Sequence, residues 1–243
     1  MELNVMTYNI CSGRDFTADR HIDVTQAGKV MQKYMPDIIG VNEVRGLGGA
    51  DPLFTEQAQT LGEQLGCHYF FGPAIEFDWG GPYGNALLTR FPILRAEVVG
   101  IPDPDVRDED AYYETRGIIR AELDIPEVPG GVLTVLVSHF GLANSEKKNA
   151  VATVCKLLDD IHTPVLFLGD LNMEPDNEIL APVFERLHDT AAILPEKPLT
   201  FSWWEPKVKI DYIFVSSEFK TLSAESPDEH TSDHKPFCAR VQI

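Results

Sequence analysis

The amino-acid sequence predicts an α+β protein, on two observations. Short runs rich in β-branched and aromatic residues recur along the 243 residues and are bounded by Gly, Pro, Asn and Asp. Only three stretches place apolar residues at the spacing of a helix. Three helices beside nine or more strands are typical of the α+β class.

The expected strands are spread over the whole chain, with few helical stretches between them. Their residues alternate in polarity or form short apolar runs, as half-buried and fully buried strands do. They are Leu3–Asn9, Ile38–Val44, His68–Phe71, Ala86–Thr89, Ile118–Ile125, Val132–His139, Val165–Gly169, Ile210–Val215 and Phe237–Ile243.

Helices are expected over Val24–Met35, Thr55–Leu65 and Ser145–Ile161. The first should end before a proline. Gly66 can take the left-handed conformation that ends the second, and Ser145 is expected to cap the third.

Three segments should form long loops, because they are polar or rich in Gly and Pro: Gly46–Pro52, Asp78–Gly84 and Pro102–Glu114. We expect them to surround a site rather than to separate domains. No internal repeat or low-complexity linker divides the chain, so residues 1–243 are expected to form one domain and to act as a monomer.

The composition restricts the environment and the substrate. No apolar run of about 18 residues is present, and the N-terminus resembles a strand rather than a signal segment, so we expect a soluble protein without a membrane span. Four cysteines without a CxxC pair favour the reducing cytoplasm. A net charge of −18 disfavours, without excluding, a long polyanion such as nucleic acid.

Polar side chains of metal-ligand type stand at the ends of the predicted strands. Four strands finish with one of them: Asn9, Glu43, His139 and Asp170. In a mixed sheet the starts of antiparallel neighbours share this edge, so Asp211 and the pair Asp233–His234 can join them. The sequence therefore predicts one acidic pocket with two histidines.

The pocket chemistry favours a hard divalent cation. Carboxylate and amide oxygens suit Mg²⁺ first and Mn²⁺ second, whereas Zn²⁺ would recruit more His or Cys. Converging carboxylates repel one another unless a cation offsets their charge, which is a further argument for a metal.

Eight segments resemble, in order, the motifs of the endonuclease/exonuclease/phosphatase superfamily: TYNI, VNEV, YGNALLTRFPI, ETRG, VSHFGL, LGDLN, IDYIF and TSDHKPF. They run from residue 5 to residue 237. The resemblance implies a DNase I-like four-layer αββα sandwich, with two mixed β-sheets flanked by helices and an active site at one edge. Nucleases, sphingomyelinases, inositol-phosphate phosphatases and tyrosyl-DNA phosphodiesterases share this fold, so the substrate stays open.

The sequence departs from the superfamily pattern in two places. Many relatives carry Gln at the position of Asn42, and the Cys11–Ile22 segment after Asn9 is longer than usual. The first change is mild, and the second could reshape the floor of the pocket.

The resemblance assigns Glu43 as the main metal ligand, and a carboxylate that ends an apolar strand is costly unless paired. Asn9 and Asp233 complete the metal site directly or through water. The alternative for Glu43 is an exposed acid at a strand end.

Five residues receive catalytic roles by the same resemblance. Asp170 and Asn172 orient the attacking water and hold a phosphoryl oxygen; the alternative is a turn with no chemistry. His234 is the general acid–base group, with Asp211 fixing its tautomer, and His139 contacts the phosphate. The remaining histidines are read as ordinary surface or core residues: His21, His68, His162, His188 and His230.

Substrate contacts are expected from four further residues. Asn85 holds the phosphate or a catalytic histidine, and Arg116 pairs either with the phosphate or with a pocket carboxylate as a structural ion pair. Trp79 and Trp203 cap an apolar or ring portion of the substrate, or anchor their loops.

Three functions follow from these residues. The leading one is metal-dependent hydrolysis of a small-molecule or lipid-derived phosphoester, monoester or diester. The second is a nuclease or DNA-repair phosphodiesterase, which the absence of a Lys/Arg cluster opposes. The third is a binding module without catalysis, although no motif position is missing.

Overall fold

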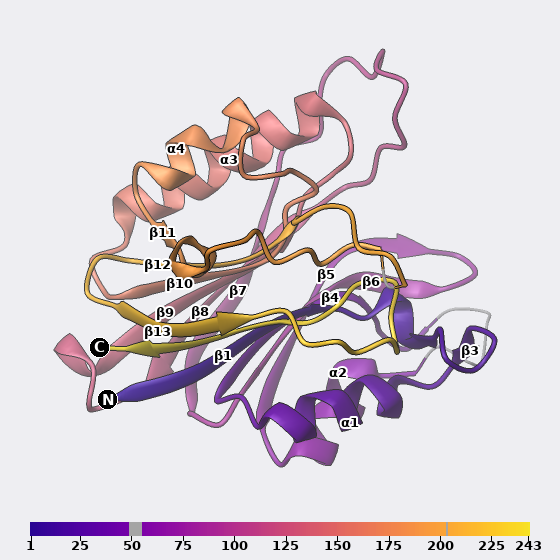
Figure 1. Cartoon of the computed structure of the whole chain (residues 1–243). Helices are drawn as coiled ribbons and strands as arrows, with labels where there is room; N and C mark the ends of the chain where they lie inside the picture. Colours follow the sequence, from indigo (N-terminus) through magenta and orange to yellow (C-terminus); the bar gives the residue numbers. More distant parts are fainter. Residues whose placement is uncertain (49–54, 203) are drawn as a thin grey trace.

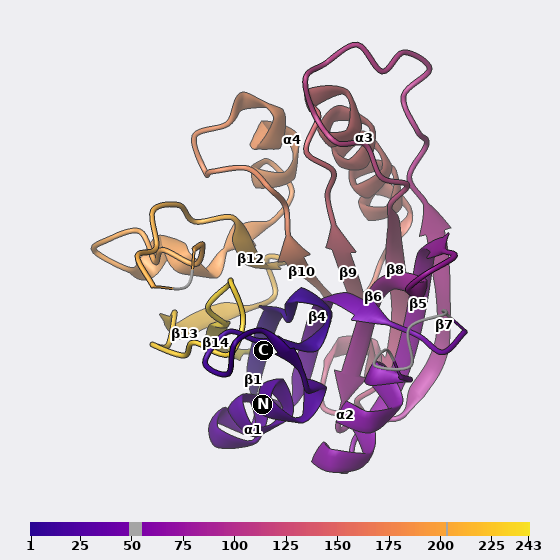
Figure 2. The same ribbon diagram turned by 90° about the vertical axis from the view of Figure 1, so that its right-hand side faces the viewer.

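The computed structural model describes residues 1–48, 55–202 and 204–243 (Figure 1). Two six-stranded mixed sheets lie face to face, and helices cover the outer face of each (Figure 2). The α+β class and the four-layer αββα sandwich expected from the sequence are therefore confirmed. None of the helices in the described ranges is long and apolar enough to cross a membrane.

The first sheet contains the strands nearest to both chain termini. Across the sheet, the order is β13 (Lys220–Glu225), β14 (Phe237–Gln242), β1 (Glu2–Asn9), β4 (Ile38–Arg45), β6 (Gly81–Thr89) and β5 (His68–Phe77). β1 and β4 are parallel, and all other neighbours are antiparallel. The ends of β1 and β4 therefore meet at one edge of this sheet.

The second sheet has the same mixed character. Its order is β11 (His188–Asp189), β12 (Asp211–Val215), β10 (Val165–Asp170), β9 (Val132–His139), β8 (Gly117–Asp124) and β7 (Ile93–Gly100). β9 and β10 are parallel, whereas β12 runs antiparallel to β10. The ends of β9 and β10 and the start of β12 thus share one edge.

Two pairs of helices form the outer layers. The helices are α1 (Val24–Tyr34), α2 (Gln57–Leu65), α3 (Asn144–Asp160) and α4 (Ala181–Phe184). Ala27 and Met31 of α1 pack in one apolar cluster with Met6 and Val41 of the first sheet. The apolar faces of α3 and α4 pack on the second sheet in a separate cluster. The helical periodicity seen in the sequence therefore corresponds to burial against a sheet.

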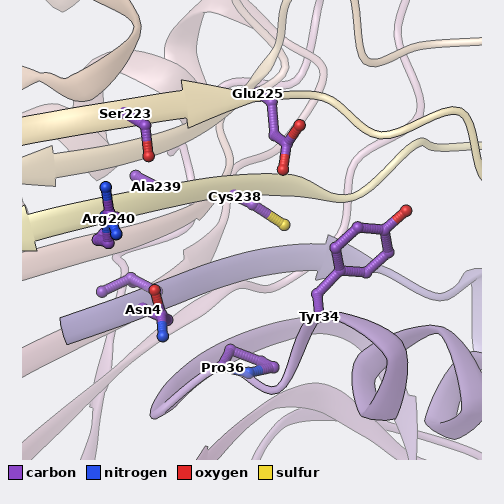
Figure 3. Close-up of a pocket in the computed structure, with 9 residues that line it drawn as sticks. Asn4, Tyr34, Pro36, Ser223, Glu225, Cys238, Ala239 and Arg240 are labelled. Atoms are coloured by element: carbon purple, nitrogen blue, oxygen red, sulfur yellow. The ribbon is translucent and has the colours of Figure 1, made fainter.

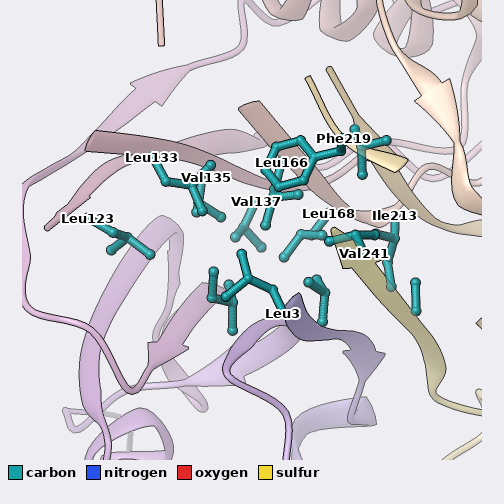
Figure 4. Close-up of a cluster of buried hydrophobic side chains, with 14 of the residues drawn as sticks. Leu3, Leu123, Leu133, Val135, Val137, Leu166, Leu168, Ile213, Phe219 and Val241 are labelled. Carbon is teal, nitrogen blue, oxygen red and sulfur yellow. The ribbon is translucent and has the colours of Figure 1, made fainter. Parts of the chain in front are cut away.

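The largest apolar cluster fills the space between the sheets (Figure 4). Leu3 and Val241 of the first sheet face Val137, Leu166 and Leu168 of the second. Burial of this kind contributes about 25 cal/mol per Å² of apolar surface, which makes the sandwich interior the main stabilising element. This cluster fixes the positions of the two sheets relative to each other.

Most expected elements are present, and several are longer than predicted. β5 continues to Phe77 and β6 begins at Gly81, so the expected loop Asp78–Gly84 is a tight hairpin connection. Besides β11 and two further two-residue strands, the structure adds two longer strands that were not predicted, β7 and β13. Both are edge strands with exposed polar residues, which weakens the apolar signal of a strand.

Short elements complete the chain. They are η1 (Cys11–Gly13), β2 (Arg14–Asp15), β3 (His21–Ile22), η2 (Pro129–Gly131), η3 (Glu178–Leu180) and η4 (Thr190–Ile193). The first three occupy the Cys11–Ile22 segment that follows the end of β1. The loop expected at Gly46–Pro52 lies only partly within the described residues.

Helix ends test the capping predictions. Gly66 has φ of 65° and ends α2, as expected. Ser145 does not cap α3 but lies inside it, so that prediction is wrong. The carboxylate of Glu109 instead accepts hydrogen bonds from the N–H groups of Asn144 (2.7 Å) and Ser145 (2.8 Å). A residue 35 positions away in sequence thus replaces the local cap.

Candidate active site

The predicted strand-end residues converge at one edge of the sandwich. Asp170, the last residue of β10, lies opposite His139 in the parallel pair with β9 and opposite Asp211 in the antiparallel pair with β12. Asn9 ends β1 in the other sheet, and its amide reaches Asp170. Residues from both sheets therefore form one buried cluster.

Asn9 joins the carboxylates of the two sheets. Its Nδ2 group donates to Glu43 Oε1 (3.1 Å) and to Asp170 Oδ2 (3.1 Å), and its Oδ1 accepts from the backbone N–H of Cys11 (3.0 Å). Its backbone carbonyl accepts from the Ser232 hydroxyl at 2.7 Å. Each polar atom of this buried amide is used, which holds the end of β1 against the site.

Glu43 owes its direction to a break in β4. The register with β6 shifts between Asn42 and Val44, and Glu43 has φ of 58°, a left-handed conformation that is unfavourable for a residue with a side chain. Backbone strain of this kind concentrates at functional sites. Burial, then the nearby Asp233 carboxylate, raises the pKa of Glu43. A cation bound here would relieve both effects.

His234 and Asp211 form a buried hydrogen-bonded pair. His234 Nδ1 lies 2.9 Å from Asp211 Oδ2, and His234 Nε2 lies 3.5 Å from Asp170 Oδ2. Burial alone would lower the pKa of His234, but Asp211 and Asp170 outweigh it and raise the pKa above its usual range. The two carboxylates therefore favour the protonated form of the imidazole.

His139 has the opposite electrostatic environment. Arg116 Nη1 lies 3.3 Å from its Nδ1, and Asn172 Nδ2 lies 3.1 Å from its Nε2. A guanidinium can only donate, so Nδ1 accepts and the neutral ring carries its proton on Nε2, where Asp170 Oδ2 at 3.5 Å can accept it and the donor-only Asn172 Nδ2 cannot. Burial, Arg116 and His234 lower the pKa of His139 well below its usual range. The pKa values of the two histidines are thus shifted in opposite directions.

Asp170 occupies the centre of the cluster. Its Oδ1 accepts from the backbone N–H of Asn172 (2.9 Å), and its own N–H donates to Asn42 Oδ1 (3.0 Å). Burial raises the pKa of Asp170, while His234 lowers it. The turn at Asn172 is therefore an Asx-type turn that lies within the cluster, and the catalytic role of Asn172 stays a prediction.

Asn42 and Asn85 link the two sheets by hydrogen bonds next to the site. Asn42 Nδ2 donates to Asn85 Oδ1 (2.8 Å) and to the carbonyl of Ser138 (2.9 Å), which crosses from one sheet to the other. Asn85 Nδ2 donates to the carbonyl of Gly117 at 3.3 Å. The expected contact of Asn85 with a histidine is absent from the described residues, and its side chain supports the sheets instead.

Arg116 and Trp79, two of the expected substrate-contacting residues, contact other side chains of the protein. Arg116 pairs with Glu114 (2.6 Å) while it contacts His139, so the structural ion pair and the position beside the pocket occur together. Trp79 is half-exposed and packs over Arg45, 4.8 Å from its guanidinium carbon to the ring centroid. Trp203 lies outside the described residues.

The charged groups of the cluster fit a divalent cation. None of the carboxylates of Glu43, Asp170, Asp211 and Asp233 is ion-paired with Lys or Arg among the residues that the structure describes. Asp211 Oδ1 is buried without a hydrogen-bond partner. The His234 imidazole can offset part of the charge of Asp170 and Asp211, and a metal ion would offset the remaining negative charge of the cluster.

Two donor sets compete for such a cation. Ligand atoms of Asp170, Asp211 and His234 lie within 4.8 Å of one another, a grouping that the sequence interpretation had treated as purely catalytic. In this set the His234 imidazole is already hydrogen-bonded to Asp211, however, and Mg²⁺ prefers oxygen ligands. The oxygen-rich set of Asn9, Glu43 and Asp233 therefore suits Mg²⁺ or Mn²⁺ better.

The sequence interpretation gave no role to two supporting residues. The Phe201 ring packs on the His234 imidazole with centroids 4.8 Å apart, and Ser232 bonds both the Asn9 carbonyl and Asp233 Oδ1. Ser232 stands inside the TSDHKPF segment, so its place in that motif was an available signal. Phe201 carries no comparable local signal, because its contact depends on tertiary packing.

Comparison with known sequences decides the family. The profile of the Endonuclease/Exonuclease/phosphatase family matches residues 6–234. The chain belongs to this family. Exodeoxyribonuclease III of Haemophilus influenzae is 30% identical over 165 residues, which are 63% of this chain and 53% of that protein. The chain thus matches only about half of the length of this relative.

Solved structures of family proteins share the fold. An endonuclease/exonuclease/phosphatase from Beutenbergia cavernae superposes with a TM-score of 0.80 at 22% identity, over 100% of this chain and 72% of that one. A mannosyl-6-phosphatase from Bacteroides thetaiotaomicron superposes with a TM-score of 0.77 at 18% identity, over 99% of this chain and 100% of that one. At this identity the likeness extends to the DNase I-like fold.

A separate cavity lies at the opposite end of β1. It measures about 240 Å³ and is lined by Asn4, Tyr34, Glu225 and Cys238 among others (Figure 3). Asn4 and Asn9 stand five residues apart on one strand, roughly 17 Å at the rise of a β-strand. This cavity therefore does not belong to the cluster around Asp170.

Proposed function

We propose that this chain is a Mg²⁺- or Mn²⁺-dependent hydrolase of a small-molecule or lipid-derived phosphoester. The observation that carries the proposal is the placement of the hydrogen-bonded His234–Asp211 pair, with His234 Nε2 3.5 Å from Asp170 Oδ2, beside the Asn9-linked Glu43. A proton donor, a carboxylate that can orient water and the proposed cation site then lie next to one another.

Each residue receives a role from its charge state. Asp170 and Asn172 orient the attacking water, whose proton passes to solvent. The water oxygen bonds to phosphorus as the ester P–O bond breaks, and His234 transfers its Nε2 proton to the leaving oxygen. Asp211 holds the His234 tautomer, and the His139 Nε2–H group donates to a phosphoryl oxygen.

The metal site is proposed at Asn9, Glu43 and Asp233. A cation held there supplies charge stabilisation to the phosphoryl oxygens. Arg116 contributes a second positive charge from the other sheet, through its place beside His139. Asn85, Trp79 and Trp203 are proposed to support or border the substrate rather than to take part in proton transfer.

The choice of a small substrate rests on charge. The net charge is −18, and the segment 102–114, whose Glu114 pairs with Arg116 beside the site, contains six acidic residues and one arginine. Such a surface repels the backbone of a polyanion. The similarity in fold to a mannosyl-6-phosphatase agrees with a small substrate.

A nuclease or DNA-repair phosphodiesterase is the second candidate. The sequence similarity to an exodeoxyribonuclease III favours it. One assay separates the candidates: turnover with saturating Mg²⁺ on p-nitrophenyl phosphate, bis-p-nitrophenyl phosphate, sphingomyelin, inositol phosphates, plasmid DNA and single-stranded DNA. Preference for DNA would select the second candidate, and no turnover on any substrate would favour a binding module.

The cellular setting is proposed on the same footing. Four free cysteines agree with a reducing compartment, which we take to be the cytoplasm. We further propose that residues 1–243 act as one domain and as a monomer. Size-exclusion chromatography with light scattering tests the last point, and a stable dimer would reject it.

A further inference from the structure

Asp211 stands where β12 has no strand neighbour on one side. Within the part of the chain that the structure describes, β11 pairs with β12 only at Phe214 and Val215, so it does not reach the start of β12. On the other side, the N–H of Leu171 donates to the carbonyl of Ile210 at 2.9 Å, and the main-chain N–H and C=O of the next residue, Asp211, therefore point away from β10. Asp211 is fully buried, so both groups need other partners.

Two side chains take the place of the missing strand. The N–H of Asp211 donates to the Thr200 hydroxyl oxygen (3.4 Å), and the N–H of Ile210 donates to the same oxygen (3.3 Å). The carbonyl of Asp211 accepts from Lys209 Nζ (3.3 Å), and the Lys209 ammonium is held in turn by Asp189 (2.9 Å). Thr200 is fully buried as well. The main chain that carries the Asp211 carboxylate is therefore fixed on its open side by a hydroxyl and an ammonium group.

Thr200 also holds the segment that carries His234. Its carbonyl accepts from the N–H of Lys235 at 2.8 Å. The next residue, Phe201, forms a β-bridge with His234 and packs its ring on the imidazole, with the centroids 4.8 Å apart. Thr200 is thus hydrogen-bonded to the main chain on both sides of the 2.9 Å contact between His234 Nδ1 and Asp211 Oδ2.

We propose that Thr200 is a positioning residue that aligns the His234–Asp211 pair for proton transfer to the leaving group. Loss of the hydroxyl leaves the buried N–H groups of Ile210 and Asp211 without their acceptor, so the start of β12 is expected to shift. A displacement of about 1 Å in a catalytic group can lower a rate by about a hundredfold. This inference rests on the proposed function, in which His234 gives its Nε2 proton to the leaving oxygen.

The test removes the hydroxyl and keeps the size of the side chain. Thr200→Val lacks the acceptor, Thr200→Ala lacks it without placing a methyl group where the hydroxyl stood, and Thr200→Ser retains it. Thr190→Val is the matched control, because Thr190 is also fully buried and its hydroxyl donates to the Ile213 carbonyl of the same strand at 3.0 Å. Thermal unfolding verifies that every variant is folded at the assay temperature.

The decisive readout is how the rate depends on the leaving group. p-Nitrophenolate leaves with little protonation, whereas an aliphatic alcohol needs the proton of His234. We measure kcat with saturating Mg²⁺ on p-nitrophenyl phosphate and glycerol 2-phosphate, or on bis-p-nitrophenyl phosphate and glycerophosphocholine if diesters are preferred. Thr200→Val and Thr200→Ala should lower kcat on the alkyl ester by roughly ten- to hundredfold and on the p-nitrophenyl ester by much less. Thr200→Ser should restore most of the alkyl-ester rate, and Thr190→Val should leave the ratio of the two rates unchanged.

An NMR measurement keeps the inference separate from the proposed reaction. The proton on His234 Nδ1, hydrogen-bonded to Asp211, should give a downfield resonance that is absent from His234→Ala, whether or not any ester is hydrolysed. This resonance should move upfield or broaden in Thr200→Val and Thr200→Ala but not in Thr190→Val. A resonance that is unchanged without the hydroxyl, or an equal loss of rate on both leaving groups, would overturn the role of Thr200. An inactive wild type with a Thr200-dependent resonance would retain the positioning role and reject only the proposed reaction.

Discussion

Asp170 and Asp211 are directly paired across β10 and β12, the last residue of one strand against the first residue of the other. The imidazole of His234 lies 2.9 Å from Asp211 and 3.5 Å from Asp170. The buried carboxylates of Asp170 and Asp211 repel each other, so the protonated form of the imidazole that contacts both is favoured. The strand register therefore favours the protonated histidine on which the proposed reaction depends.

Loss of this imidazole should abolish most of the activity. We expect His234→Ala to lower kcat by about 10²–10⁴-fold, the usual contribution of general acid–base catalysis. Steady-state kinetics on the best phosphoester of the panel measures the loss. The exposed His162 offers a matched control, since His162→Ala should leave kcat unchanged. Turnover close to that of the wild type would remove His234 from the mechanism.

Removal of metal should stop turnover reversibly. We expect EDTA to abolish activity and added Mg²⁺ or Mn²⁺ to restore it, because the carboxylates around Asn9 need a cation. Glu43→Gln should weaken metal binding in calorimetry, whereas Glu63→Gln on α2 should not. Full activity in the presence of chelator contradicts the metal-dependent reaction.

Salt should change the preference between substrates. We expect a small or lipid phosphoester to have a higher kcat/KM than duplex DNA, because the net charge of −18 repels polyanions. The advantage should shrink as salt rises, since the Debye length is only about 10 Å at 0.1 M ionic strength. Assays at two salt concentrations and saturating Mg²⁺ measure both values. If duplex DNA is the better substrate at low salt, the charge argument fails.

A buried lysine should give the folded state an unusual pH dependence. Lys209 Nζ pairs with Asp189 at 2.9 Å and lies 3.2 Å from the centroid of the Tyr212 ring. Burial lowers its pKa to about 8, although Asp189 partly offsets the effect. The unfolded value is about 10.4, so between these values the unfolded state binds more protons and the contribution of Lys209 to stability rises with pH.

Denaturant unfolding from pH 7.5 to pH 10 measures this contribution. Lys209→Met should destabilise the protein by about 3–5 kcal/mol, because it leaves Asp189 buried without its partner. The gap between wild type and Lys209→Met should widen as pH rises through the window. Lys207→Met is the matched control, since that side chain is 74% exposed and should change little. A gap that is constant with pH would contradict the lowered pKa.

The local pattern of the chain was enough for much of the fold. Alternating and apolar runs located the strands that end in Asn9, His139 and Asp170, because burial of a strand imposes its pattern on consecutive residues. Edge strands such as β7 were not predicted, because one face and one edge of such a strand are exposed to solvent. Local chemistry also sufficed for Gly66, whose left-handed conformation ends α2.

The chemistry of the site followed from sequence only up to the identity of its groups. Strand ends brought carboxylates and histidines to one edge, but nothing local predicts that the pKa values of His139 and His234 are shifted in opposite directions. That difference depends on Arg116 beside one ring and two carboxylates beside the other, which are contacts between distant segments. Charge state is a property of the assembled environment.

By itself, then, the sequence determined which side chains the strands carry to their ends and which faces are buried, since both depend on neighbours along the chain. Only the tertiary structure decided that Glu109 rather than Ser145 caps α3 and that a bulge turns Glu43 toward Asn9. Each of these depends on segments remote in sequence, whose hydrogen bonds and burial exist only after the two sheets have packed.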